Sequence, residues 1–207
     1  MISPLAYIHP EAKIGENVEI GPFVFIDKNV EIGDNNTIRE NVTINRGTAA
    51  KGKTIVGNNN LLMEGVHVAH DTIVGSGCII GNSTKMAGEV IIDDNAIVSA
   101  NVLMHQFCRV GGYVMIQGGC RFSKDIPPYI VAAHEPIAFY SINTKVLELA
   151  GFSETLIKHI AQAYRILYKA NTSQHDALLR IQEQVPNSPE IERIIEFVKT
   201  SKLGIIH

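Results

Sequence analysis

The sequence repeats every six residues, and this repeat constrains the fold more than any other feature. One position of each hexad carries an aliphatic, Met or Phe side chain: Ile8, Ile14, Ile20, Ile26, Ile32, Ile38 and Ile44, then Val56, Leu62, Val68, Val74, Ile80, Met86, Ile92, Val98, Met104, Val110, Ile116 and Phe122. A period of six fits neither a helix with 3.6 residues per turn nor a single alternating strand. It is typical of a parallel β-helix in which every sixth side chain points inward.

Small residues usually follow the inward position: Gly15, Gly21, Gly33, Gly57, Gly75, Gly81 and Gly111, with Asp, Asn and Ser elsewhere. Such residues tolerate tight or positive-φ backbone, so we expect them to form the corners of the coil. If three flat sides make one coil, about 18 residues complete a turn. Residues i and i+18 then stack about 4.8 Å apart, which is the spacing of neighbouring strands.

Two interruptions divide the chain. Ile44 and Val56 lie two hexads apart, with only Ala50 at the inward position between them, so we expect the Gly- and Lys-rich segment 46–53 to be an extruded loop. The hexads end near Asp125, where prolines follow. We predict a hexapeptide-repeat β-helix in residues 1–135 and a helical domain in residues 136–207.

Three helices are expected after Gly151. Apolar residues follow one helical stripe in residues 153–169. Ser173 with Asp176 resembles a capping box before residues 177–185, and Ser188 followed by a first-turn proline caps residues 191–199. The C-terminal part is therefore predicted to be a small helical bundle.

Composition excludes several classes of protein. A net charge of −3 argues against a dedicated nucleic-acid binder. No apolar run reaches the length of a membrane span, and the N-terminus lacks the pattern of a signal peptide, so we expect a cytoplasmic protein. The spacings between Cys78, Cys108 and Cys120 are not multiples of one coil, so we expect neither a disulfide nor a thiolate metal cluster.

Coil spacing gathers three residues into one column. His70, Gly88 and Gln106 follow each other at the interval of one predicted coil, and His105 lies beside the last of them. A neutral histidine can take a proton near pH 7, and a glycine leaves its backbone N–H open to an oxyanion. The column predicts acyl transfer to a hydroxyl or amine, with His70 as base, Gly88 N–H as oxyanion donor, and Gln106 and His105 as substrate contacts.

The histidines also permit another chemistry. Catalytic zinc takes three imidazoles and an open water position, and an interface in a β-helix trimer could gather His67, His70 and His105. That arrangement would give a hydratase-type enzyme. The column of His70 and Gln106 favours acyl transfer, so we expect neither a metal nor a cofactor.

Short motifs recur along nearly the whole chain: His9-Pro10, Ile20-Gly21-Pro22-Phe23, Arg39 to Ile44 leading to Arg46-Gly47-Thr48, Asn60 to Met63, His67 to Asp71, His105 to Cys108, Asp125 to Tyr129 and Gly151-Phe152-Ser153. Together they strongly resemble the UDP-N-acetylglucosamine O-acyltransferase family of lipid A biosynthesis. The resemblance implies a left-handed parallel β-helix followed by a helical domain. It also implies a homotrimer with sites between subunits.

The resemblance further implies transfer of an (R)-3-hydroxyacyl group from acyl carrier protein to the 3-hydroxyl of UDP-N-acetylglucosamine. By position, His70 matches the general base and Gly88 the oxyanion donor. The positions that match substrate contacts are His67, His105, Gln106 and Asn143, and Gly118 lies where the acyl chain packs. A basic surface facing the acidic carrier protein is expected from Arg109, Arg121, Lys124, Lys158, Arg165 and Lys169.

The chain departs from the family pattern at three places. Several coils and a loop bearing an Asn-Gln-Asp motif are missing between Gly33 and Ile38, Glu89 replaces a histidine, and Leu149 and Ala150 replace two phosphate-binding arginines. Loss of an arginine from a phosphate site removes charge-assisted hydrogen bonds. Two alternatives therefore remain open: a related acyltransferase with a different acceptor or donor, and a catalytically silent trimeric scaffold.

Overall fold

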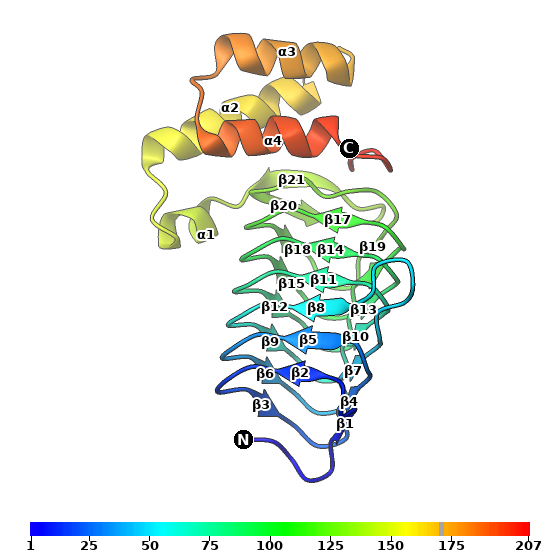
Figure 1. The fold of residues 1–207 in the computed structure, drawn as a ribbon. Helices are drawn as coiled ribbons and strands as arrows, with labels where there is room; N and C mark the ends of the chain where they lie inside the picture. The colour runs from blue at the N-terminus through cyan, green and yellow to red at the C-terminus, as the bar shows by residue number, and fades with distance from the viewer. Residues whose placement is uncertain (170–171) are drawn as a thin grey trace.

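The computed structural model describes residues 1–169 and 172–207 as a three-sided parallel β-helix with helices at its C-terminal end (Figure 1). The front sheet, C, consists of β2 (Lys13–Ile14), β5 (Val30–Ile32), β8 (Thr54–Val56), β11 (Ile73–Val74), β14 (Ile91–Ile92) and β17 (Arg109–Val110). In Figure 1 the strands of this front sheet point to the left while the chain rises from the N-terminus, so the coil is left-handed, as the family resemblance implies.

The other two sheets complete the prism. Sheet B consists of β1 (Tyr7–Ile8), β4 (Phe25–Ile26), β7 (Thr43–Ile44), β10 (His67–Val68), β13 (Lys85–Met86), β16 (Leu103–Met104) and β19 (Arg121–Phe122). Sheet A consists of β3 (Glu19–Ile20), β6 (Thr37–Ile38), β9 (Leu61–Leu62), β12 (Ile79–Ile80), β15 (Ile97–Val98), β18 (Met115–Ile116), β20 (Ile130–Ala133) and β21 (Ala138–Ile142). Every strand is parallel to its neighbours except β21, which pairs antiparallel with β20.

The predicted coil length is confirmed outside the loop except in the last coil, where Met115 pairs with Val131 at an interval of 16 residues. Lys85 pairs with Leu103 at the spacing of 18 residues that also joins Lys13 to Glu31. Across the extruded loop the interval grows to 24 residues, as between Thr43 and His67. The loop therefore adds one hexad and keeps the order of the three faces, and Ala50 is exposed within it.

The inward side chains form one continuous apolar column. They are buried from Ile20 to Phe122, whereas Ile8 and Ile14 in the first coil are only partly covered. Burial of this kind is the main stabilising term of a solenoid, in which each coil covers its neighbour.

The expected role of the corner glycines needs correction. Positive φ occurs three residues after the inward position, as at Asn17, Asn35 and Asn95, and not at the glycines that directly follow it. Those glycines are required by close approach of successive coils: a Cβ at Gly21 would lie 2.8 Å from Glu40 N, and one at Gly81 would lie 2.5 Å from Ala100 N.

Helices cover the C-terminal end of the prism: α1 (Thr144–Leu149), α2 (Glu154–Lys169), α3 (Gln174–Gln184) and α4 (Pro189–Lys199). The predicted caps are confirmed, because the Ser173 hydroxyl accepts from Asp176 N and the Ser188 hydroxyl accepts from Ile191 N. The first helix begins at Thr144, after β21 has extended sheet A beyond residue 136; the division into two domains stays a prediction. Within the described part of the chain, no helix combines the length and apolar character of a membrane span.

Candidate active site

The imidazole of His70 packs directly against the backbone of Gly88, on the coil that precedes it. His70 follows β10 at the corner between sheets B and C, and Gly88 occupies the same corner one coil later, between β13 and β14. A Cβ at Gly88 would lie 2.3 Å from His70 Nε2 and 2.4 Å from its Cε1. Any side chain at position 88 would therefore displace the imidazole.

The backbone amide of Gly88 differs from those on either side. Ala87 N donates to Met104 O at 3.1 Å, and Glu89 N donates to His70 O at 2.9 Å. Within residues 1–169 and 172–207, Gly88 N donates no hydrogen bond. An N–H that is free and adjacent to an imidazole can stabilise a negative oxygen formed there.

Asp71 binds the other ring nitrogen of His70, Nδ1. Its Oδ2 lies 2.9 Å from His70 Nδ1, and the carboxylate is shielded from solvent. Burial alone would raise the pKa of Asp71, but hydrogen bonds from Thr48 and His70 outweigh it and lower the pKa. Because an ionised carboxylate can only accept, Nδ1 carries the proton and Nε2 over Gly88 is the basic atom.

The extruded loop supplies two further bonds to this carboxylate. Thr48 N donates to Asp71 Oδ1 at 2.8 Å, and the Thr48 hydroxyl donates to Oδ2 at 2.5 Å. Asp71 N in turn donates to Thr54 Oγ1 at 2.8 Å. Sequence reasoning assigned no role to Asp71 or Thr48; the adjacency of Asp71 to His70 was an available signal, whereas the position of Thr48 depends on the path of the loop.

The other sequence-predicted residues divide into two groups. Gln106 belongs to the coil above Gly88, since Phe107 N donates to Gly88 O at 3.2 Å, and His105 lies beside it with Nδ1 3.2 Å from Gln106 O. His67 is half-buried on β10, with Nδ1 2.7 Å from Thr43 Oγ1. Burial and, to a smaller extent, the charge of Lys85 lower the pKa of His67, which favours its neutral form.

Asn143 and Gly118 lie at the two other corners of the prism. Asn143 is buried before α1, where its side chain donates to Tyr113 O at 2.9 Å. Gly118 is exposed after β18, beside a hollow of about 440 Å³. Within one chain the structure therefore does not bring either residue to His70.

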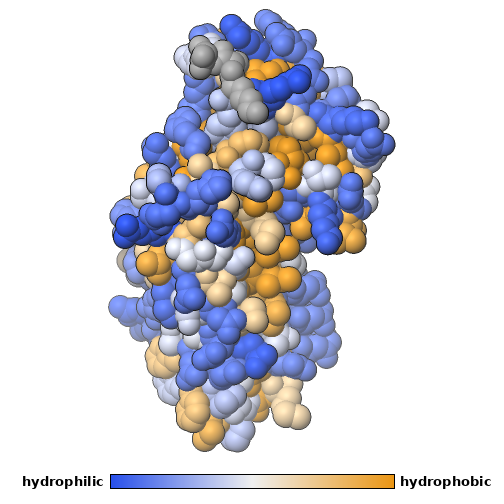
Figure 2. All heavy atoms as spheres, turned by 180° about the vertical axis from the view of Figure 1, so that it is seen from behind, coloured by the Kyte–Doolittle hydropathy of each residue, from blue (hydrophilic) through white to orange (hydrophobic). Residues whose placement is uncertain are grey.

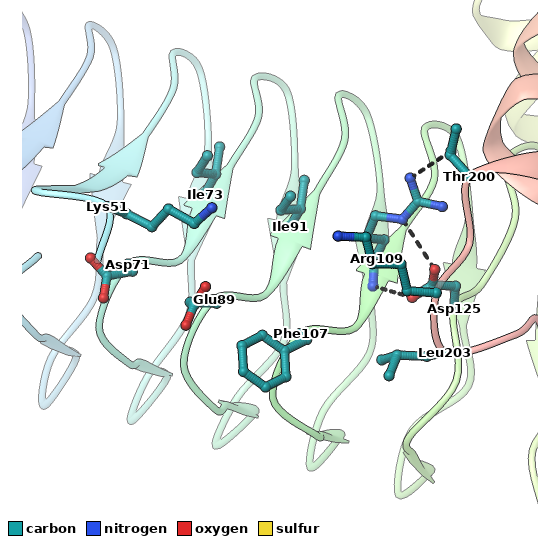
Figure 3. Close-up of a pocket in the computed structure, with 11 residues that line it drawn as sticks. Lys51, Asp71, Ile73, Glu89, Ile91, Phe107, Arg109, Asp125, Thr200 and Leu203 are labelled. Carbon is teal, nitrogen blue, oxygen red and sulfur yellow. Dashed lines mark hydrogen bonds and ion pairs between the residues drawn. The ribbon is translucent and has the colours of Figure 1, made fainter. Parts of the chain in front are cut away.

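A groove of about 420 Å³ runs along sheet C next to Asp71 (Figure 3). Ile73 and Ile91 line it from the strands, Glu89 and Phe107 lie along the corner, and Lys51 extends over it from the loop. Leu203, in the C-terminal segment after α4, borders its far end. The groove thus combines an apolar floor with charges of both signs.

Three positions lack the groups that the family pattern would supply. Leu149 and Ala150 are exposed at the end of α1 and offer no charge to a phosphate. Glu89 is half-buried and adopts a φ of 58° at the corner after Gly88.

The thiols offer no alternative nucleophile. Cys78, Cys108 and Cys120 are free and buried. They lie on three different faces, as their spacing predicted. Burial raises the pKa of Cys78 to about 11 and that of Cys108 to about 12, so both are protonated near neutral pH. In the described part of one chain, no group of three His, Cys, Asp or Glu residues could hold a metal ion.

Two family models match parts of the chain. Residues 125–206 match the second domain of UDP N-acetylglucosamine O-acyltransferase, and residues 1–91 match the C-terminal domain of GMPPB. Among curated proteins, an acyl-[acyl-carrier-protein]–UDP-N-acetylglucosamine O-acyltransferase from Sulfurihydrogenibium sp. (strain YO3AOP1) is 37% identical over 82 residues, or 40% of this chain. The match spans only 30% of that relative's length.

Similar solved structures span the whole chain. A UDP-N-acetylglucosamine acyltransferase from Bacteroides fragilis 9343 is 59% identical with a TM-score of 0.89, and both chains are covered over 100% of their length. A structure of LpxA from Acinetobacter baumannii is 30% identical with a TM-score of 0.86, and the match covers 100% of this chain and 99% of the other.

Proposed function

The chain belongs to the UDP-N-acetylglucosamine O-acyltransferase family, and we propose that it transfers an (R)-3-hydroxyacyl group from acyl carrier protein to the 3-hydroxyl of UDP-N-acetylglucosamine, the first step of lipid A biosynthesis. One observation carries the proposal. His70 Nε2 stands over the backbone of Gly88, whose amide makes no hydrogen bond among the described residues.

The proposed reaction begins at His70. Nε2 takes the proton of the sugar 3-hydroxyl while its oxygen attacks the thioester carbonyl. Gly88 N–H stabilises the resulting oxyanion. The intermediate collapses when the C–S bond breaks, and the proton on Nε2 passes to the departing thiolate, so that the carrier protein leaves as the free thiol. The product is an ester, and no covalent acyl-enzyme is formed.

Asp71 completes this site. Its carboxylate fixes the Nδ1–H tautomer of His70 and stabilises the imidazolium that forms during the reaction, as a buried carboxylate does in other histidine-based acyl transfers. His67 lies on the coil of His70, and His105 and Gln106 lie on the coil after Gly88; all three are proposed substrate contacts.

We infer that the active assembly is a homotrimer. Asn143 and Gly118, proposed to contact the acceptor and the acyl chain, lie at corners away from His70, and a cyclic assembly would bring corners of different chains together. Apolar side chains are also exposed on the coils, including Ile79 and Met115 of sheet A, and Figure 2 shows a hydrophobic band beneath the helices.

Light scattering tests this assembly. The molar mass in solution should be about three times the 22.7 kDa mass of one chain.

The acidic carrier protein is proposed to dock on basic residues near the late coils. Lys124 and Arg165 are exposed, and so is Arg121, although its Nε lies 3.6 Å from Glu135 Oε1 in a solvent-exposed ion pair. Lys158 is paired with Glu154, and Arg109 is bound to Asp125, Thr200 and the Phe197 carbonyl, so neither presents a free charge. The side chain of Lys169 lies outside the described residues. A cytoplasmic location follows from these substrates.

The direct test is product formation. The protein is incubated with UDP-N-acetylglucosamine and (R)-3-hydroxyacyl carrier protein, and acylated sugar nucleotide is sought by mass spectrometry. We expect product with wild type and at least about a hundredfold less with His70→Ala, at an unchanged melting temperature. Equal turnover by His70→Ala would exclude the proposed base.

A different acceptor is the second candidate, because exposed Leu149 and Ala150 offer no phosphate contact. A panel of nucleotide sugars, tested with carrier-protein and coenzyme A thioesters, separates the two. Preference for another acceptor would support the second candidate. Absence of both product and calorimetric binding with every pair would instead indicate a silent scaffold.

A further inference from the structure

The neck of the extruded loop is closed tightly around Thr48. Gly47 lies so near the returning strand that a Cβ there would be 2.1 Å from Lys53 Cα. Gly47 N donates to Asn29 O, and Gly52 N donates to Thr48 O at 2.6 Å. Thr48 is therefore held at the neck of the loop.

From this position Thr48 donates hydrogen bonds to both oxygens of the Asp71 carboxylate. Its backbone N–H bonds Oδ1, and its hydroxyl bonds Oδ2, the same oxygen that accepts from His70 Nδ1. The Thr48 hydroxyl also accepts from Ala50 N at 3.2 Å, which orients its proton towards the carboxylate. The carboxylate plane is thereby fixed from the loop side.

We propose that Thr48 is a positioning residue of the transfer reaction, acting through Asp71 to keep His70 Nε2 over Gly88. The proposal rests on the proposed function and adds to it a connection between the loop and the base. Thr48 touches neither the reacting atoms nor Gly88. Its contribution is to the orientation of Asp71 and therefore to the tautomer and direction of the imidazole.

Three variants separate this role from a structural one. Thr48→Val keeps the shape and backbone N–H but removes the hydroxyl, Thr48→Ser keeps the hydroxyl, and Ala49→Ser adds one at an exposed neighbouring position. We expect Thr48→Val to lower kcat about tenfold, the size of one hydrogen bond to a charged group, with an unchanged KM for the sugar nucleotide. Thr48→Ser and Ala49→Ser should retain nearly wild-type kcat, and all melting temperatures should agree.

A second measurement does not depend on turnover. ¹⁵N NMR of histidine-labelled protein, with His70 assigned from the spectrum of His70→Gln, reports which ring nitrogen is protonated. Wild type and Thr48→Ser should show the Nδ1–H tautomer, and Thr48→Val should show a mixture.

The outcomes separate the two proposals. Wild-type kcat in Thr48→Val, a change only in KM, or equal losses of kcat and melting temperature in Thr48→Val and Thr48→Ser would overturn the positioning role. An unchanged tautomer in Thr48→Val would do the same. Absence of product from wild type with every donor and acceptor would overturn the proposed function, while the tautomer comparison would still decide the connection between Thr48 and His70.

Discussion

At the scale of single residues, the site depends on the absence of a side chain at position 88. Gly88 has no Cβ, and His70 Nε2 and Cε1 lie where that atom would be. Gly88 does not adopt positive φ, so the backbone itself would accept an alanine. Replacement should therefore affect the imidazole much more than the fold.

Gly88→Ala is expected to lower kcat by about a hundredfold or more, because it displaces His70, the proposed base, and hinders access to the amide. Steady-state kinetics and thermal melting measure the two effects separately. Gly112→Ala is the matched control at another corner, where the nearest atom to a new Cβ is Asp94 O at 3.0 Å. Similar kinetic losses in both variants would contradict the specific role of Gly88.

The contact of His70 with Gly88 followed from the repeat, because no insertion lies between the two residues. Thr48 could not be assigned in the same way. It lies in the loop that lengthens one coil to 24 residues, so coil spacing does not give its neighbours. Its bonds to Asp71 depend on the three-dimensional path of the loop neck.

At the scale of elements, the helical part is fastened to the prism through Asp125. Asp125 Oδ1 accepts from Arg109 N at 2.8 Å, and Oδ2 accepts from Arg109 Nε at 3.1 Å and from the Ser201 hydroxyl at 2.8 Å. The Arg109 guanidinium also donates to Phe197 O at 2.7 Å and lies 4.3 Å from the centre of the Phe197 ring. One buried carboxylate thus joins the last coils, α4 and the C-terminal segment.

Asp125→Ala should lower the free energy of unfolding by about 3 kcal/mol, since it leaves Arg109 without its buried partner. Urea denaturation followed by circular dichroism provides the measurement. Lys124→Ala, at an exposed adjacent position, should change the free energy by less than about 0.5 kcal/mol. If Asp125→Ala and Lys124→Ala unfolded at the same urea concentration, Asp125 would not be a stabilising link between the coils and the helices.

The elements themselves were largely predictable, for identifiable reasons. Hexads report burial directly, and caps such as Ser173 act within a few residues. Strand β21 and helix α1 were not expected, because neither has a clear repeat and β21 depends on pairing with β20. Buried Asn36 and Asn60 were also missed: Asn36 Oδ1 accepts from Asn60 N, and Asn60 Oδ1 accepts from Cys78 N, a ladder that only stacked coils create.

At the scale of the whole molecule, net charge conceals local asymmetry. The chain carries −3 overall, yet exposed Arg121, Lys124 and Arg165 belong to the late coils and first long helix. Encounter with the proposed partner, an acidic carrier protein, should therefore depend on ionic strength.

Raising salt from about 50 to 200 mM should increase the KM for the acyl carrier protein several-fold and change the KM for the sugar nucleotide less. Arg121→Gln should reproduce part of the increase at low salt. Lys13→Gln removes an equal charge from the N-terminal coils and serves as the control. Identical salt responses of all three proteins would exclude Arg121 from the docking surface.

The coils that carry Thr48, His70 and Gly88 are consecutive and lie well inside the stack. In a quasi-one-dimensional array, opening spreads inward from the ends, and the first coil, with Ile8 and Ile14 only partly covered, is the weakest rung. We expect fraying there to leave the proposed reaction centre undisturbed. Local unfolding at the N-terminal coil is therefore not coupled to the geometry of the proposed site in the central coils. A globular core of equal size, in which distant segments pack against each other, does not offer this separation.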